Sequence, residues 1–187
     1  MRKRSTAKLA LSVFLAEISA TFLSFIIVFL VGGFTNNAAV NFLMQAFLLV
    51  MYFGFIYSNP NMDGDRERNL IRVGQLEENK LKGLNAGLIA MLPKLLTSIL
   101  LVLVKLGVTG NFPQIIYRMI NSQFVILINH IMPSTDTGNM SIPTWGQIAV
   151  VTALQLLIPL ISGMAYFFGY RGIHPIRGTV LKKDVKK

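Results

Sequence analysis

The sequence predicts an all-α polytopic membrane protein with four transmembrane helices and one interfacial or re-entrant amphipathic helix on the outer side. Of the 187 residues, 53% are hydrophobic and only 14% are charged, whereas a soluble domain usually carries about 25% charged residues. Mean hydropathy is +0.57. The apolar residues form long blocks, and Glu17 is the only charged residue between Leu9 and Met62. Apolar blocks of about 18 residues or more are typical of transmembrane helices.

The first two spans are expected over about residues 9–31 and 38–57. The first block follows the basic stretch MRKRSTAK, and it is longer than the roughly 7–15 apolar residues of a signal peptide. We therefore expect an uncleaved span. The connector GGFTNN is short, so the two spans should form an antiparallel hairpin.

A cytoplasmic loop is expected over residues 58–83. Pro60 and Gly64 indicate a turn, and acidic and basic residues alternate in DGDRER, residues 63–68. This pattern favours a solvated loop with surface salt bridges. The same hexapeptide matches only a fragment of the motif of CDP-alcohol phosphatidyltransferases, because Glu67 replaces the expected alanine and the later aspartates are missing.

The third span is expected over about residues 84–108 and the fourth over about 146–170, with Trp145 at its outer end. Between them, residues 111–134 carry polar side chains on one helix face and apolar side chains on the other. We expect this segment to lie in the plane of the membrane interface, with a re-entrant segment or a fifth span as alternatives. The N-terminus and the tail, residues 171–187, are both basic, and the positive-inside rule places both in the cytoplasm.

Glu17 and Lys94 are the two charges that lie deep inside predicted spans, whereas Lys105 lies near the far end of the third span, where its side chain can reach the interface. Glu17 lies nine residues after Lys8, roughly 13 Å along a helix, and Lys94 lies twelve residues after Lys82, roughly 18 Å. A lysine side chain can bend by several ångströms, so the two charges could meet and form an ion pair. An unpaired charge at this depth costs about 2.5–3.5 kcal/mol. Further intramembrane polar candidates are Gln155 and the series Asn37, Asn41 and Gln45.

Small residues recur every fourth position in the first span, at Ser12, Ala16, Ala20 and Ser24. Such a stripe lets helix backbones approach closely in lipid. The Ala16-x-x-x-Ala20 step resembles one in the substrate-binding subunits of energy-coupling-factor transporters, which usually have six spans. No residue role is carried over from that resemblance.

The composition excludes several classes of function. The chain has no cysteine, and it has no phosphate-binding glycine-rich loop or catalytic triad order. We expect no enzyme activity, no metal site and no cofactor. The net charge of +10 is explained by basic residues beside the spans, so no nucleic-acid binding is expected.

Two functions remain. The first is a small membrane subunit that assembles with other membrane chains or with itself. The alternative is a transporter or channel component with a polar path around Glu17 and Lys94. Expected partners are the lipid bilayer and, for Lys182, Lys183, Lys186 and Lys187, anionic lipid headgroups. The expected location is the cytoplasmic membrane.

Overall fold

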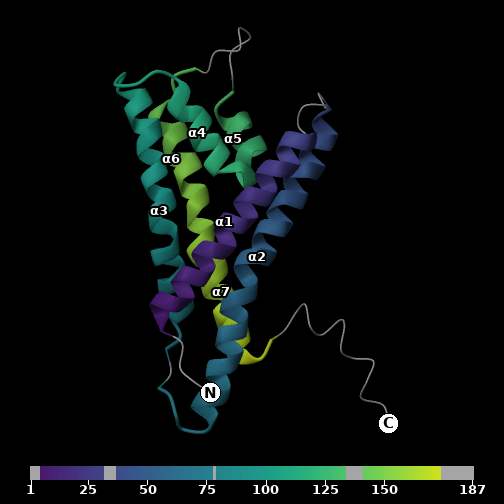
Figure 1. The fold of residues 1–187 in the computed structure, drawn as a ribbon, viewed down its shortest axis with the longest axis vertical. Coiled ribbons are helices and arrows are strands. Elements are labelled where there is room, and N and C mark those ends of the chain that lie inside the picture. Colours follow the sequence, from purple (N-terminus) through teal and green to yellow (C-terminus); the bar gives the residue numbers. More distant parts are fainter. Residues whose placement is uncertain (1–4, 32–36, 78, 134–140, 174–187) are drawn as a thin grey trace.

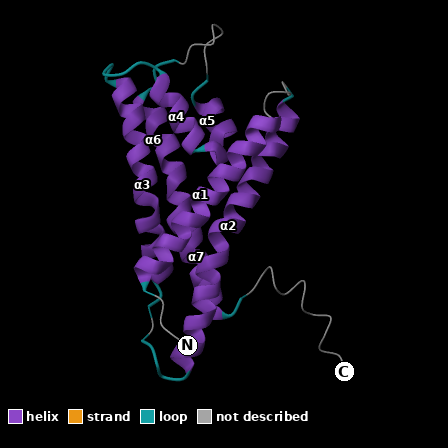
Figure 2. Cartoon of the chain, in the orientation of Figure 1, coloured by secondary structure: helices purple, strands orange, loops and turns teal. Residues whose placement is uncertain are grey.

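The computed structural model describes residues 5–31, 37–77, 79–133 and 141–173, and these residues form helices and no strand (Figure 2). The helical segments are, in chain order, α1 (Thr6–Val31), α2 (Ala38–Arg72), α3 (Lys82–Lys105), α4 (Phe112–Ile120), the 3-10 turn η1 (Ser122–Phe124), α5 (Val125–Ile131), α6 (Trp145–Ala153), the 3-10 turn η2 (Leu154–Leu156) and α7 (Leu157–Arg171).

Four described helices are long and apolar enough to cross a membrane: α1, α2, α3 and the combined run Trp145–Arg171. The predicted fold class is confirmed. These helices run between two ends of the bundle (Figure 1). The lower end holds the start of α1, the end of α2, the start of α3 and the end of α7, and the upper end holds the opposite termini.

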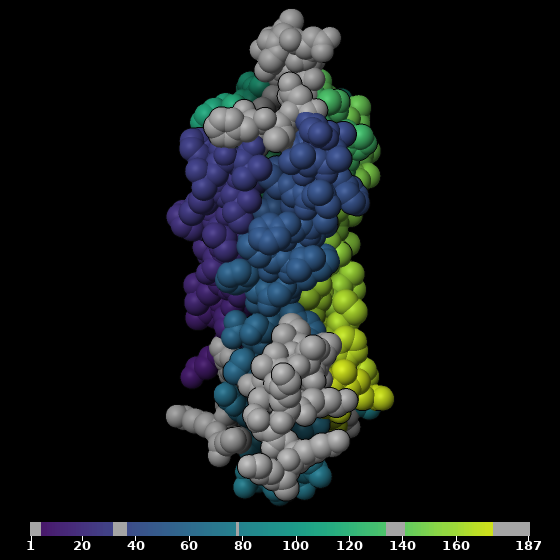
Figure 3. Space-filling model, turned by 90° about the vertical axis from the view of Figure 1, so that its right-hand side faces the viewer, coloured from purple at the N-terminus to yellow at the C-terminus, as the bar shows by residue number. Residues whose placement is uncertain are grey.

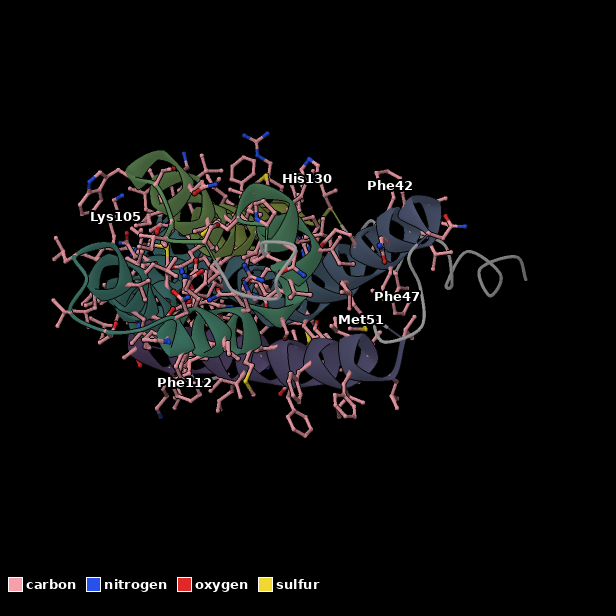
Figure 4. The ribbon with its side chains drawn as sticks, turned by 90° about the horizontal axis from the view of Figure 1, so that it is seen from above. Phe42, Phe47, Met51, Lys105, Phe112 and His130 are labelled. Atoms are coloured by element: carbon pink, nitrogen blue, oxygen red, sulfur yellow. The ribbon has the colours of Figure 1, made fainter. Side chains whose placement is uncertain are left out.

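The outside of the bundle is apolar. Phe29, Phe42 and Val50 are 76%, 73% and 70% exposed, and Phe42 points away from the bundle when the molecule is seen from above (Figure 4). Exposed apolar surface of this extent marks contact with an apolar environment, which for helices of this length is the lipid bilayer.

Residues 58–72 are helical, which corrects the predicted loop over residues 58–83. Helix α2 continues through Pro60 and Gly64 to Arg72. The reason is tertiary packing. A Cβ atom at Gly64 would lie 2.2 Å from the carbonyl oxygen of Tyr166, so α2 and α7 are in backbone contact there. Gly64 therefore serves close helix packing rather than a turn.

Helix α7 also packs closely against α3. A Cβ at Gly83 would lie 2.2 Å from Cβ of Tyr166, and one at Gly87 would lie 2.5 Å from Cα of Pro159. Gly169 faces α2 in the same way, since a Cβ atom built at Gly169 would lie 2.0 Å from the carbonyl oxygen of Asn61. Small residues at helix crossings are the usual means of tight association in membranes.

Residues 112–131 form a re-entrant helical hairpin rather than a helix lying flat on the upper end. Helix α4 descends from the upper end, η1 turns the chain, and α5 returns to the same end (Figure 1). The turn is buried, since Ser122 and Gln123 are 2% and 0% exposed. Seen from above, the hairpin lies among α1, α2, α3 and α6 (Figure 4).

Helix ends follow local sequence signals. The Asn37 side chain accepts a hydrogen bond from the Ala39 backbone N–H at the start of α2. Thr144 and Gln147 form a capping box at the start of α6, as expected for Thr followed three residues later by Gln. After α3 and α7, Gly107 and Gly172 adopt positive φ values of 71° and 75°, which glycine accommodates without strain.

Candidate functional site

Glu17 of α1 and Lys94 of α3 form an ion pair in the middle of the bundle. The Lys94 Nζ atom lies 2.5 Å from Oε1 of Glu17. The two residues are 3% and 5% exposed, so neither charge faces lipid. Burial without a partner would be costly for either group, and the pair ties α1 to α3.

Tyr52 brings α2 to the same place. Lys94 Nζ lies 5.6 Å from the centroid of the Tyr52 ring, within the range of a cation–π contact. The ring also meets Phe124 of the hairpin edge-on, with centroids 5.3 Å apart. The buried Tyr52 hydroxyl has no hydrogen-bond partner among the described residues. The sequence places Tyr52 near the polar face of the second span with Gln45, but its contact with Lys94 depends on how the helices cross and was not predicted.

The tip of the hairpin is held by polar contacts to α1 and α2. Ser122 Oγ donates to the carbonyl oxygen of Thr21 at 2.7 Å, and Thr21 Oγ1 donates to Oε1 of Gln123 at 3.2 Å. Gln45 Nε2 donates to the Gln123 carbonyl at 2.9 Å, and Gln45 Oε1 accepts from the Leu127 N–H at 3.3 Å. Gln45 is therefore a partner of the hairpin. Non-helical backbone at this depth is tolerated only where protein satisfies it.

The last span tightens into a 3-10 turn at η2, where Gln155 lies, without interrupting the helical run Trp145–Arg171. Gln155 Nε2 donates to Ser98 Oγ at 3.3 Å and to the Tyr117 hydroxyl at 3.4 Å. The Tyr117 hydroxyl in turn donates to the Val151 carbonyl at 3.2 Å. Ser98 is one helical turn beyond Lys94 on α3, so the Gln155 cluster lies next to the ion pair along that helix.

A pocket opens beside the ion pair, between α1, α3 and α4, with a volume of about 430 Å³. Its lining is apolar apart from the pair and two threonines. The lining residues are Phe14, Glu17, Ile18, Thr21, Phe22, Phe25, Pro93, Lys94, Thr97, Met119 and Ile120. Pockets of this size and composition are typical of small-molecule sites.

Asn37 and Asn41 do not reach this centre. Asn37 caps α2, and Asn41 lines a separate hollow of about 680 Å³ between α2 and α5 at the upper end. The polar residues predicted from sequence thus divide between the centre of the bundle, with Glu17, Lys94, Gln45 and Gln155, and its upper end.

The small-residue stripe of α1 faces two environments. Ala20 and Ser24 are buried inside the bundle, whereas Ser12 and Ala16 line an open groove between α1 and α2. This groove measures about 720 Å³, and its α2 wall includes Met51, Gly54 and Ser58. Helices α1 and α2 lie side by side on this face (Figure 3), and Met51 projects from α2 toward α1 (Figure 4).

A second buried charge cluster lies at the lower end. Lys82 Nζ forms ion pairs with Asp63 Oδ2, at 2.9 Å, and with Glu67. The Tyr166 hydroxyl donates to the other Glu67 oxygen at 2.6 Å. Asp63, Glu67 and Lys82 are at most 3% exposed. These acids are therefore interior groups, which corrects the predicted solvated loop. The available signal was the four-residue spacing of Asp63 and Glu67, which places both on one helix face.

In the part of the chain that the structure describes, no three His, Asp or Glu side chains gather where they could hold a metal ion. The four lysines from Lys182 to Lys187 proposed to bind lipid headgroups lie outside the described residues.

Comparison with known proteins adds no relative. No protein-family model, no curated protein and no solved structure matches the chain. The class is defined by the fold and the site alone: a small polytopic helical membrane protein with a buried ion pair, a re-entrant hairpin and a lateral pocket.

Proposed function

We propose that the chain is a membrane subunit that receives a transmembrane helix of another membrane chain in the groove between α1 and α2. The observation that carries this proposal is the groove itself, since small side chains form both of its walls. Its walls contain Ser12, Ala16, Ser19, Gly54 and Ser58. In lipid, helices associate by close packing rather than by hydrophobicity, and small residues allow that approach.

The groove has room that the chain does not fill. A Cβ atom built at Gly54 meets no atom within 4 Å. Large apolar side chains flank the groove, and two of them, Leu15 and Val50, are 53% and 70% exposed. An incoming helix could therefore bury apolar surface along the rims and approach the backbone along the floor.

The absence of cysteine from the chain makes a direct test possible. Ser19→Cys places a single thiol in the groove, and Ile99→Cys places one on the exposed outer face of α3. We expect a bifunctional thiol reagent, applied to native membranes, to join the Ser19→Cys variant to another membrane chain and to leave the Ile99→Cys variant largely unjoined. Mass spectrometry of the adduct then identifies the partner chain.

Two outcomes would contradict this assignment. An adduct of twice the chain mass would show that a second copy occupies the groove. Equal adducts from both variants would show random collision in the membrane. Ala16→Leu, which fills the groove, should abolish the specific adduct while leaving the subunit folded.

The orientation that we propose places the lower end in the cytoplasm. Basic side chains gather there, and few lie at the upper end, which fits the positive-inside rule. The described basic residues of the lower end are Lys8, Arg66, Arg68, Arg72, Lys80, Lys82 and Arg171, against Lys105 and Arg118 nearer the upper end.

A second candidate function is a transport component, favoured by one observation. The helical hairpin is interrupted at η1, and its Gln123 meets Thr21, one helical turn from Glu17. The 3-10 turn η2 places Gln155 against Ser98, one helical turn from Lys94. Discontinuous helices at mid-bundle commonly form transport sites. The test is ion or proton flux in proteoliposomes. A flux that Glu17→Gln abolishes favours transport, whereas no flux in either protein counts against it.

A further inference from the structure

We propose that the pocket beside Glu17 and Lys94 binds an uncharged, membrane-soluble amphiphile, with a hydrocarbon chain along α1 and one hydroxyl group at the ion pair. This inference does not rest on the proposed role in assembly, because the pocket lies between α1, α3 and α4 and the groove lies between α1 and α2.

The pocket opens toward the lipid. Its rim residues Ile18, Phe22 and Met119 are among the exposed apolar side chains of the bundle, with Phe22 65% exposed. The charged groups lie at the inner wall, 3% and 5% exposed. A ligand that enters here therefore comes sideways, out of the hydrocarbon of the bilayer.

Entry from the hydrocarbon core excludes charged ligands. An ion or a zwitterion is strongly disfavoured in the hydrocarbon core, whereas an alcohol or a similar neutral compound dissolves there. The pair offers no net charge to compensate a charged ligand, because Glu17 and Lys94 neutralise each other. A charged ligand would also have to displace one member and leave it buried without its partner.

The ion pair can still bind a polar group. A lysine ammonium has three hydrogen-bond donors and a carboxylate has about four acceptor positions. Among the described residues, Lys94 Nζ meets only Glu17 and the face of Tyr52. A ligand hydroxyl can accept from Lys94 and donate to Glu17 at once, which a carbonyl or an ether cannot do.

The length of the apolar part is set by α1. The α1 wall of the pocket begins at Phe14, and from the ion pair at Glu17 it continues to Phe25, eight residues or roughly 12 Å along a helix. Phe22 and Phe25 supply wide apolar walls over this length, and Met119 is a flexible thioether that adapts to different chains. A medium-length hydrocarbon chain fits, and a polycharged headgroup does not.

The experiment uses three photoreactive probes that share one diazirine-bearing hydrocarbon chain. The first ends in a hydroxyl group, the second in a methyl group and the third in a trimethylammonium group. The full chain in lipid nanodiscs is irradiated with each probe, and the labelled peptides are identified by mass spectrometry. We expect the alcohol to label α1 around Ile18 and Phe22 and α4 around Met119, and the other two probes to label these segments weakly.

Matched variants locate the label. Ile18→Trp and Met119→Trp fill the mouth from two different helices, and both positions are exposed, so folding should be retained. Each should reduce labelling of the opposite wall. Leu43→Trp, at an exposed apolar position of α2 outside the pocket, should leave labelling unchanged.

The double variant Glu17→Gln with Lys94→Met removes both charges and leaves no unpaired ion. It should weaken labelling by the alcohol about tenfold, the size of one hydrogen bond to a charged group, and leave the methyl probe unaffected. Equal labelling by the alcohol and methyl probes would overturn the proposal, since the pocket would then be a crevice for any lipid chain. Stronger labelling by the trimethylammonium probe, or no effect of both tryptophan variants, would overturn it as well.

Discussion

At the scale of single residues, Glu17 and Lys94 depend on each other. Each is buried and its charge is balanced by the other across 2.5 Å. Removing one partner of a buried pair leaves an uncompensated charge, which typically costs about 3–5 kcal/mol. Removing both charges together is often close to neutral.

We therefore expect a positive coupling energy between Glu17→Gln and Lys94→Met, above about 1 kcal/mol. Lys94→Met alone should destabilise the protein more than the double variant, because it leaves the carboxylate buried and unpaired. The coupling energy is obtained from the unfolding free energies, measured in nanodiscs, of the unmodified protein, the two single variants and the double variant. Additive effects would show that the two charges are not energetically paired and would favour a functional reason for retaining Glu17.

Lys82 should matter more to stability than its position at the end of a helix suggests. It is the basic partner of both Asp63 and Glu67, so Lys82→Met leaves two buried carboxylates close together. We expect a loss of about 3–5 kcal/mol in unfolding free energy. Tyr166→Phe removes only one hydrogen bond to Glu67 and should cost about 1.5–3 kcal/mol.

The exposed Lys80 provides the control for this experiment. Lys80→Met should change the unfolding free energy by no more than about 0.5 kcal/mol. If Lys82→Met were as mild as Lys80→Met, the lower cluster would be solvated rather than buried. The ion pair between Asp65 and Arg68 differs from this buried cluster, because its two side chains are 26% and 32% exposed.

At the scale of elements, two glycines of the same helix serve opposite purposes. Gly64 touches the backbone of α7, and Gly54 faces open space. Gly64→Ala must push α2 and α7 apart, because both of its nearest neighbours are backbone atoms, at 2.2 and 2.8 Å. We expect a cost of about 1–3 kcal/mol, as for other overpacking substitutions.

Gly54→Ala is the matched control, at a helical position with room for the methyl group. It should be neutral or stabilise the isolated subunit by about 0.5–1 kcal/mol, since glycine is unfavourable within a helix. The same unfolding measurement compares both variants. Equal effects at the two positions would mean that α2 and α7 do not meet at Gly64 as described.

The hairpin and the 3-10 turn at η2 show what local patterns can predict. The amphipathic character of residues 111–134 was visible in the sequence, and so was the polar character of Gln155. A re-entrant segment was one of the alternatives for these residues, but the pattern could not select it, because Ser122 and Gln123 take their partners from Thr21 and Gln45, on two other helices. The sequence pattern alone is compatible with a flat helix.

At the scale of the whole molecule, the basic residues at the lower end predict, by the positive-inside rule, that this end faces the cytoplasm. Cysteine introduced at Lys80 probes the lower end, and cysteine at Val108 probes the upper end. In intact cells a membrane-impermeant maleimide should label Val108→Cys, and it should label Lys80→Cys only after permeabilisation. The reverse pattern would invert the proposed orientation.

The candidate site was only partly predictable at this scale. The pairing of Glu17 with Lys94 was predictable, because the rise per residue of a helix gives the distance of each charge from the basic residue at the start of its span. Tyr52, Gln123 and the pocket could not be found in this way, since they depend on crossing angles between helices. The turn residues Pro60 and Gly64 and the mixed charges of residues 63–68 predict a solvated loop, and only the contact with Lys82 and Tyr166 makes Asp63 and Glu67 interior groups.

The sequence by itself determined the membrane class, the four long apolar helices and the two charges, Glu17 and Lys94, deep inside them. These are local properties, since about 18 apolar residues in a row must form a helix to satisfy their backbone in lipid. Tertiary structure decided the rest: the extension of α2 to Arg72, the re-entrant hairpin, the lower cluster and the pocket. Each of these depends on contacts between helices distant in sequence, which apolar periodicity does not encode because lipid and protein interiors are equally apolar.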